Sequence, residues 1–127
     1  MSKIINTKEL GHIGENAAAN FLMRSGYQII DKNWVCGKYE IDIVCQKNND
    51  IVFVAVKSHH RNSLFNVKNV VGKDKRRKII YSADKYVRLK NIELNARFDI
   101  IEVVFSSENV SEIIHLEDAF YVNRSLF

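Results

Sequence analysis

Two carboxylates and one lysine are the residues of this sequence best suited to chemistry. Glu40 and Asp42 lie two positions apart, and Lys57 follows them after a polar run. Hard divalent cations such as Mg²⁺ bind carboxylate oxygens, backbone carbonyls and water, and a lysine beside the metal can position or deprotonate an attacking water. These residue types therefore indicate phosphodiester hydrolysis. A surface ion pair between Glu40 and Lys57, with Asp42 solvated, explains the same residues equally simply.

A predicted β-hairpin brings these side chains together. A two-residue turn at positions 48–49 sets Asp42 opposite Ala55. The same register sets Glu40 opposite Lys57. Because side chains alternate along a strand, all four residues share one face. The other face carries an apolar set suited to the core, namely Ile41, Ile43, Cys45, Val52, Val54 and Val56.

Glu15 is a further candidate carboxylate, on a predicted first helix. An N-cap at Asn6 with Glu9 three residues later begins this helix, which ends before Gly26. Glu15 falls at the border of the apolar stripe, and Gly11, one turn earlier, leaves room for a close approach. A solvated edge residue and a site ligand both fit this position.

A run of cations lies at the start of the second predicted helix, which spans about residues 73–89. A helix N-terminus favours acids, so cations there suggest an external anion such as the phosphate backbone of a nucleic acid. An ordinary solvated face fits the run as well. The candidate nucleic-acid contacts are Lys73, Lys75, Arg76, Arg77 and Lys78, with His59 and Arg61 extending the same rim.

Hydrophobic periodicity and turn residues predict the elements that must position these groups. Strands are expected at residues 27–35, 39–46, 51–57, 97–105 and 112–115, and a turn of helix at 117–121. The order is then α-β-β-β-α-β-β-α. This predicts the α/β class, with a mixed sheet flanked by helices in a single domain over residues 1–127.

Composition excludes several classes of protein. The 127 residues carry 19 Lys and Arg against 15 Asp and Glu, a formal charge of +4 that permits binding to polyanions. No apolar run is long enough to span a membrane, and the start lacks the apolar stretch of a secretory signal, so we expect a cytoplasmic protein without a membrane partner. The two cysteines are not spaced as a zinc site.

Several runs in the chain resemble one protein family, in order and over almost the whole length. They are Gly14-Glu15, Gly26-Tyr27, Asn33-Trp34, Glu40-Ile41-Asp42-Ile43-Val44, Val52 to Ser58, Arg97-Phe98-Asp99, and the late His115 with Asp118-Ala119-Phe120. The sequence is similar to the YraN-like family of uncharacterised bacterial proteins. That family belongs to the restriction-endonuclease-like superfamily, with its PD-(D/E)xK site, and is similar to archaeal Holliday junction resolvases.

The resemblance implies a restriction-endonuclease-like fold and roles for individual residues. Asp42 would bind Mg²⁺ or Mn²⁺, Lys57 would be the catalytic lysine, and Glu15 an additional catalytic carboxylate and metal ligand. The carbonyl of Val56 would be a further metal ligand. The chain departs from the pattern at Ala55, where the family has glutamate, and the loss of one ligand weakens a site for a cation that needs oxygen donors.

Glu40 could replace the missing ligand, since it lies on the same face two residues from Asp42. Three functions follow from these observations. The first is a metal-dependent endonuclease, impaired by Ala55, that acts on structured DNA. The second is a non-catalytic DNA-binding module, and the third a protein-interaction domain. Symmetric cleavage of a four-way junction would need a homodimer, which no sequence feature establishes.

Overall fold

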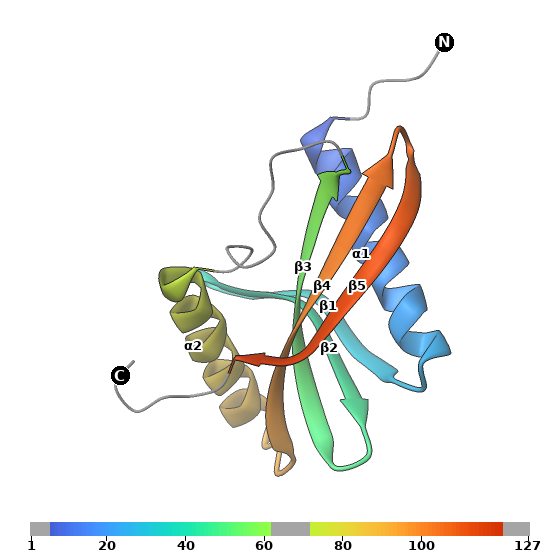
Figure 1. The fold of residues 1–127 in the computed structure, drawn as a ribbon. Helices are drawn as coiled ribbons and strands as arrows, with labels where there is room; N and C mark the ends of the chain where they lie inside the picture. Colours follow the sequence, from blue (N-terminus) through green and yellow to red (C-terminus); the bar gives the residue numbers. More distant parts are fainter. Residues whose placement is uncertain (1–5, 62–71, 121–127) are drawn as a thin grey trace.

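One mixed sheet of five strands runs through the protein in the order β1-β2-β3-β4-β5 (Figure 1). The computed structural model describes residues 6–61 and 72–120. The strands are β1 (Gln28–Cys36), β2 (Tyr39–Lys47), β3 (Asp50–His60), β4 (Asn95–Ser106) and β5 (Asn109–Phe120). Only β3 and β4 pair in parallel, while the other neighbours are antiparallel. The predicted α/β class with a mixed sheet is confirmed.

Two helices complete the fold. Helix α1 (Thr7–Arg24) begins where predicted, because the Asn6 side chain accepts a 2.8 Å hydrogen bond from the backbone N–H of Glu9. Helix α2 (Lys73–Lys90) lies in the connection between the parallel strands, and Asn91 ends it in the left-handed region. Neither helix is long and apolar enough to span a membrane.

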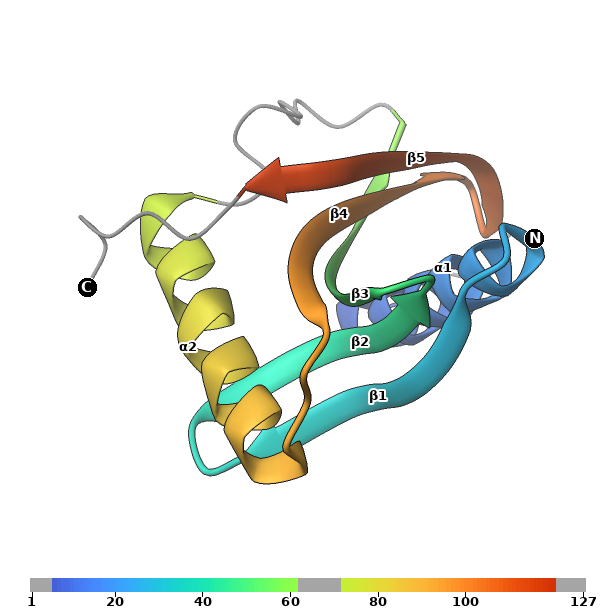
Figure 2. The ribbon, with the colours of Figure 1, turned by 90° about the horizontal axis from the view of Figure 1, so that it is seen from below.

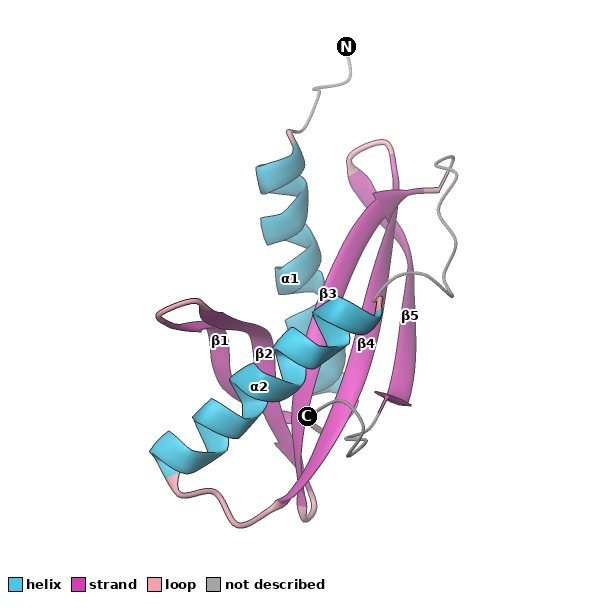
Figure 3. Ribbon diagram, turned by 90° about the vertical axis from the view of Figure 1, so that its left-hand side faces the viewer, coloured by secondary structure: helices cyan, strands magenta, loops and turns pink. Residues whose placement is uncertain are grey.

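The helices cover opposite faces of the sheet (Figure 3). Helix α2 packs Ile80, Ala83 and Tyr86 against one face, where Phe53 is fully buried. Helix α1 packs Ala18 and Leu22 against the other face. Seen from below, β4 and β5 curve strongly, with α2 near one end of the sheet and α1 near the other (Figure 2). Both faces of the sheet are therefore core.

The hairpin of β2 and β3 has the predicted register near its turn, but the predicted pairs of Asp42 with Ala55 and of Glu40 with Lys57 are not formed. Lys47 pairs with Asp50, and the ladder continues to Ile43 and Val54. Beyond that point no further pairing of β2 with β3 is formed, while β2 stays paired with β1 back to Tyr39. The alternation of β2 side chains between the two faces of the sheet is also broken at this point. The prediction for Ile41 is wrong, because its side chain packs in the cluster under α2, whereas Ile43 packs under α1.

The predicted turn of helix at residues 117–121 is wrong as far as the structure describes it. Residues 117–120 continue β5, and Tyr121 lies outside the described residues. Phe120 pairs with Phe98 across the sheet, and the two rings stack with centroids 5.1 Å apart. The backbone bulges at Asp118, whose N–H donates to the Asp99 carboxylate. Contacts to β4 thus override the local helical preference.

Candidate active site

Asp42 lies where β2 separates from β3. One of its carboxylate oxygens, Oδ2, accepts a 2.8 Å hydrogen bond from the backbone N–H of Val56. The carboxylate therefore satisfies a backbone donor at the point where the β2–β3 ladder ends. This bond fixes the orientation of Asp42 at the fork between the two strands.

The surroundings of Asp42 disfavour its negative charge. Burial raises the pKa of Asp42, and the nearby charge of Glu40 raises it further. The hydrogen bond from Val56 and the positive charge of Lys57 lower the pKa, but they do not outweigh burial. A cation near Asp42 would relieve this unfavourable electrostatic environment. The predicted proximity of Glu40, Asp42 and Lys57 is thus present in the structure.

Glu15 reaches the same region from α1. Burial raises the pKa of Glu15, and the charge of Asp42 is the second cause. A hydrogen bond with the Asn33 side chain and the charges of His12 and Lys32 act in the opposite direction. The tertiary fold therefore brings together two carboxylates that are far apart in the sequence.

A glycine allows α1 to come this close to the sheet, but it is not the one expected. A Cβ at Gly14 would lie only 1.9 Å from Oγ of Ser58 on β3. A Cβ at Gly11 would have no neighbour within 4 Å, so the predicted close approach at Gly11 is wrong. Gly14 lies immediately before Glu15 and sets the depth at which that carboxylate sits. A glycine on the apolar side of a helix is the signal that identifies such a contact.

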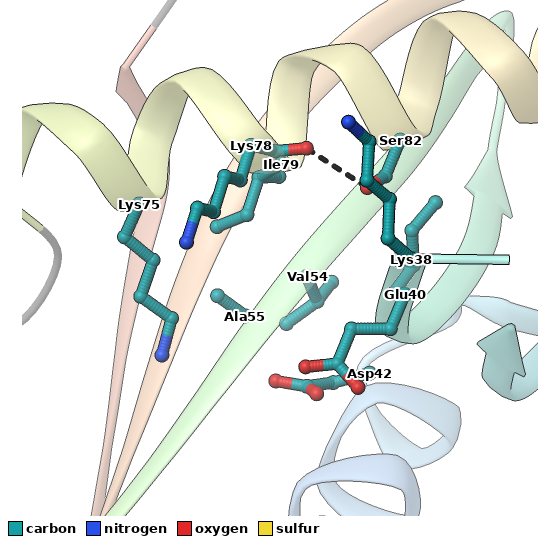
Figure 4. A pocket seen from close by; sticks show the side chains of 10 residues that line it. Lys38, Glu40, Asp42, Val54, Ala55, Lys75, Lys78, Ile79 and Ser82 are labelled. Carbon is teal, nitrogen blue, oxygen red and sulfur yellow. Dashed lines mark hydrogen bonds between the residues drawn. The ribbon is translucent and has the colours of Figure 1, made fainter.

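A pocket of about 200 Å³ opens beside Asp42 on the face of the sheet covered by α2 (Figure 4). Helix α2 contributes Lys75 and Lys78, and β2 contributes Glu40 and Asp42. Figure 4 shows the ammonium ends of the two lysines on one side of Ala55 and the two carboxylates on the other. The remaining lining residues are Lys38, Ile41, Val54, Ile79 and Ser82.

The described side chains around Asp42 do not supply the oxygen ligands that the divalent cation implied by the resemblance needs. Within residues 6–61 and 72–120, no three Asp, Glu, His or Cys side chains are arranged to hold a metal ion. Ala55 lines the pocket with a methyl group and offers no oxygen ligand. The residues as arranged do not fit a bound Mg²⁺ that relies on protein carboxylates, because such ions need several oxygen donors.

The predicted nucleic-acid contacts at the start of α2 lie partly in the pocket and partly outside it. Lys75 and Lys78 line the pocket, and Lys73 is exposed. Arg76 instead lies over the ring of Phe120, with its guanidinium carbon 5.7 Å from the ring centroid. Arg77 is half-buried, and its Nε has no hydrogen-bond partner among the described residues. Helical spacing thus separates neighbours in the sequence into different environments.

At the end of β3, the predicted nucleic-acid contacts His59 and Arg61 also lie in different environments. Arg61 is exposed, and its backbone N–H donates to the carbonyl of Phe105. His59 points inward, with Nε2 3.1 Å from an oxygen of Glu102. Glu102 is fully buried on β4, and burial raises its pKa. Sequence reasoning missed this glutamate, although an acid inside the apolar run of residues 100–105 is a signal that could have identified it.

A second group of buried polar residues lies on the face covered by α1. Asp99 is completely buried and accepts hydrogen bonds from Arg97 at 2.7 and 2.9 Å. His115 Nε2 lies 2.7 Å from the same carboxylate. Arg97 also donates to the hydroxyl of Tyr27, just after α1. This network ties β4 and β5 to the segment that follows α1.

The sequence comparisons place most of the chain within one family. The model of the uncharacterised protein family UPF0102 matches residues 14–103. A UPF0102 protein of Phocaeicola vulgatus is 40% identical over 113 residues, which cover 89% of this chain and 93% of that protein. A UPF0102 protein of Clostridium beijerinckii is 37% identical over 125 residues, covering 97% and 100% of the two chains. These similarities agree with the predicted membership of an uncharacterised bacterial family.

Proposed function

The chain belongs to the uncharacterised protein family UPF0102, and we propose that it binds nucleic acid, in particular DNA, at an endonuclease-like site whose hydrolytic activity is impaired. The observation that carries this proposal is the pocket of opposed charges around Ala55. Lys75 and Lys78 form its cationic side, while Glu40 and Asp42 form its acidic side. Such a site can contact a phosphate on one side and polarise a bound group on the other.

Binding to a nucleic-acid backbone is supported by the distribution of cations. Lys73 and Arg61 are exposed, and Lys75 and Lys78 line the pocket. The chain has a formal charge of +4. Lysine and arginine contacts to phosphates release condensed counterions, so affinity for DNA should fall steeply with salt.

Hydrolysis is impaired in this proposal because the donor set is incomplete. Asp42 is held by the Val56 N–H and is within electrostatic reach of Lys57 and Glu15. These groups can orient a phosphate and a water molecule, but Ala55 supplies no ligand. A divalent cation, when bound at a complete site of this type, would supply Lewis acidity and an activated water.

Ala55 also favours a second candidate function, a non-catalytic DNA-binding module that keeps the frame of a nuclease. The impaired endonuclease and the non-catalytic module differ in whether a glutamate at position 55 would restore cleavage. We therefore compare the protein with its Ala55→Glu and Ala55→Gln variants on labelled branched, duplex and single-stranded DNA. Each reaction is run with Mg²⁺, with Mn²⁺ and with EDTA.

We expect cleavage by Ala55→Glu alone, abolished by EDTA, because only a carboxylate adds a metal ligand at this position. The Ala55→Gln variant has nearly the same size and controls for filling the pocket. Adding Lys57→Met to Ala55→Glu should remove the activity if Lys57 has the predicted catalytic role. If neither variant cleaves but both bind DNA, the non-catalytic module is the correct function. Absence of salt-sensitive DNA binding by all three proteins would refute both candidates.

A further inference from the structure

Lysines from two separate elements converge on the pocket around Ala55. Lys75 and Lys78 lie three residues apart, and so on the same side of α2. Lys38 reaches the pocket from the turn between β1 and β2. Three cations thus line a space that contains two carboxylates, Glu40 and Asp42. The lining is net positive when all five groups are charged.

The side chains of the two helix lysines have no polar partner among residues 6–61 and 72–120. The ammonium groups of Lys75 and Lys78 form no hydrogen bond or ion pair with another described residue, and only the backbone carbonyl of Lys78 accepts a bond, from the Ser82 hydroxyl. Both lie in the first half of α2, where the helix dipole disfavours a positive charge. By contrast, Arg88 near the other end of α2 pairs with Asp84 at 2.9 Å. No described residue therefore competes with an external anion for the ammonium groups of Lys75 and Lys78.

The pocket beside Ala55 is small, although Lys38, Lys78 and Ser82 also line a second pocket of about 460 Å³. At about 200 Å³ the pocket beside Ala55 is smaller than the roughly 300–1,000 Å³ pockets that hold drug-sized ligands. Ala55 and Val54 form part of its apolar lining, and Ile79 closes it from α2. A terminal phosphoryl group can enter such a space end-on, whereas an internal phosphodiester continues into a sugar on both sides.

The charge of the pocket lining also favours a terminal phosphoryl group. A phosphomonoester carries about −1.5 to −2 charges at neutral pH, against one for an internal phosphodiester, and accepts hydrogen bonds on three oxygens. Two ammonium groups match that charge. Glu40 and Asp42, on the other side of Ala55, repel the same anion and confine it to the lysine side.

We infer that this pocket binds the terminal phosphate of a nucleic-acid strand through Lys75 and Lys78, and that it does so without a divalent cation. The inference rests on the proposed function, and it names the chemical class of ligand that the site takes. The two lysines supply the positive charge that a metal ion supplies at sites with a full set of carboxylates.

The test measures binding of short duplexes by fluorescence anisotropy in EDTA. The duplexes share one sequence and carry a 5′-phosphate, a 3′-phosphate or only hydroxyl ends. We expect a phosphorylated end to bind on the order of tenfold more tightly than a hydroxyl end. The two phosphorylated duplexes show which end enters the pocket. Inorganic phosphate at millimolar concentration should compete with the phosphorylated duplex more than with the unphosphorylated one.

The double variant Lys75→Gln with Lys78→Gln should lose the preference for a phosphorylated end. Lys85→Gln with Lys90→Gln is the matched control, because both of these lysines are exposed on α2 and neither lines the pocket. The control should keep the full preference while losing the same formal charge. Thermal unfolding of all variants shows whether they are folded.

Three results would overturn the inference while leaving the proposed function intact. They are equal affinity for phosphorylated and hydroxyl ends, a preference that requires Mg²⁺, and a preference that survives in the Lys75 and Lys78 double variant. In each case, salt-dependent binding to DNA would persist. Absence of binding to every duplex at low salt would instead refute the proposed function and the inference with it.

Discussion

Asp42 is half-buried and Asp99 is fully buried in the same sheet, and their environments shift the carboxylate pKa in opposite directions. Burial raises the pKa of both carboxylates. At Asp99, hydrogen bonds from His115, Arg97 and the Asp118 N–H outweigh burial, so its pKa lies below the ordinary value. At Asp42, the Val56 N–H and the charge of Lys57 do not outweigh it, and the pKa is raised.

This difference distinguishes a structural carboxylate from one available for chemistry. Asp99 has hydrogen-bond donors on both oxygens, from β4 and β5. Asp42 uses Oδ2 for Val56 and borders an open pocket lined by lysines. A buried carboxylate whose two oxygens both accept hydrogen bonds stabilises the folded structure. A carboxylate with only one oxygen bonded can still interact with a ligand. Substitutions at the two aspartates should therefore change stability in opposite directions.

The largest effect is expected for Asp99→Ala. Removing this carboxylate leaves Arg97 and His115 without their buried counter-charge, so the free energy of unfolding should fall by about 3–5 kcal/mol. Urea denaturation at pH 7 measures the change. Asp84→Ala is the control, because it breaks only an exposed pair with Arg88 and should cost about 0.5 kcal/mol or less. Similar losses of unfolding free energy in Asp99→Ala and Asp84→Ala would contradict the structural role of Asp99.

The pH dependence of the Asp99 contribution follows from the lowered pKa. The folded protein holds the ionised form more strongly than the unfolded chain does, so the contribution is present above the ordinary pKa of 3.8. It is lost as pH falls below 3.8 and through the folded pKa. The difference in stability between the protein and Asp99→Asn should therefore shrink in acid. Denaturation curves between pH 7 and pH 3 check this expectation.

A smaller effect is expected at the contact that places Glu15 near Asp42. In Gly14→Ala the new methyl group would collide with Ser58, and overpacking of this kind costs about 1–3 kcal/mol. Gly11→Ala is the matched control in the same helix. It meets no atom within 4 Å, and replacing glycine in a helix should stabilise the protein by about 0.5–1 kcal/mol. If denaturation shows that both variants change stability in the same direction, the close approach of α1 to β3 at Gly14 is disproved.

The smallest change, of opposite sign to that at Asp99, is expected for Asp42→Asn. The raised pKa means that the folded state disfavours the ionised form, so the penalty grows as pH rises from 3.8 through the folded pKa. Asparagine removes the charge and keeps an oxygen that can accept from Val56. We expect a gain of about 0.5–2 kcal/mol at pH 7, which disappears below pH 3.8. Loss of stability at pH 7 would make Asp42 a structural residue like Asp99.

Much of the fold could be predicted because its signals are local. The Asn6 cap, the two amphipathic helices and the hairpin turn each depend on residues close together in the chain. The predicted register of β2 and β3 is correct from the turn to the Ile43–Val54 pair for the same reason, since a two-residue turn fixes which residues face each other nearby. The error at Ile41 begins where that ladder ends, and local pattern no longer specifies which face its side chain takes.

The candidate site could be predicted only in part. The proximity of Glu40 and Lys57 to Asp42 was predicted from cross-strand pairs that the structure does not form, because the β2–β3 ladder ends at Ile43 and Val54. The role of Gly14, the division of the basic run and the burial of Glu102 could not be derived in this way. Each depends on atoms contributed by another element, such as Ser58 beneath Gly14. The strand at residues 117–120 is a similar case, because Phe98 stabilises it across the sheet.

The sequence by itself therefore determined the class of fold, most of its elements and the residues capable of chemistry, because hydrophobic periodicity and residue type are properties of short segments. Only the tertiary structure decided that Glu15 approaches Asp42, that Lys75 and Lys78 face the pocket around Ala55, and that Asp99 is fully paired. Those outcomes depend on how α1 and α2 pack on the two faces of the sheet. Packing is set by contacts between residues far apart in the chain, which no local pattern encodes.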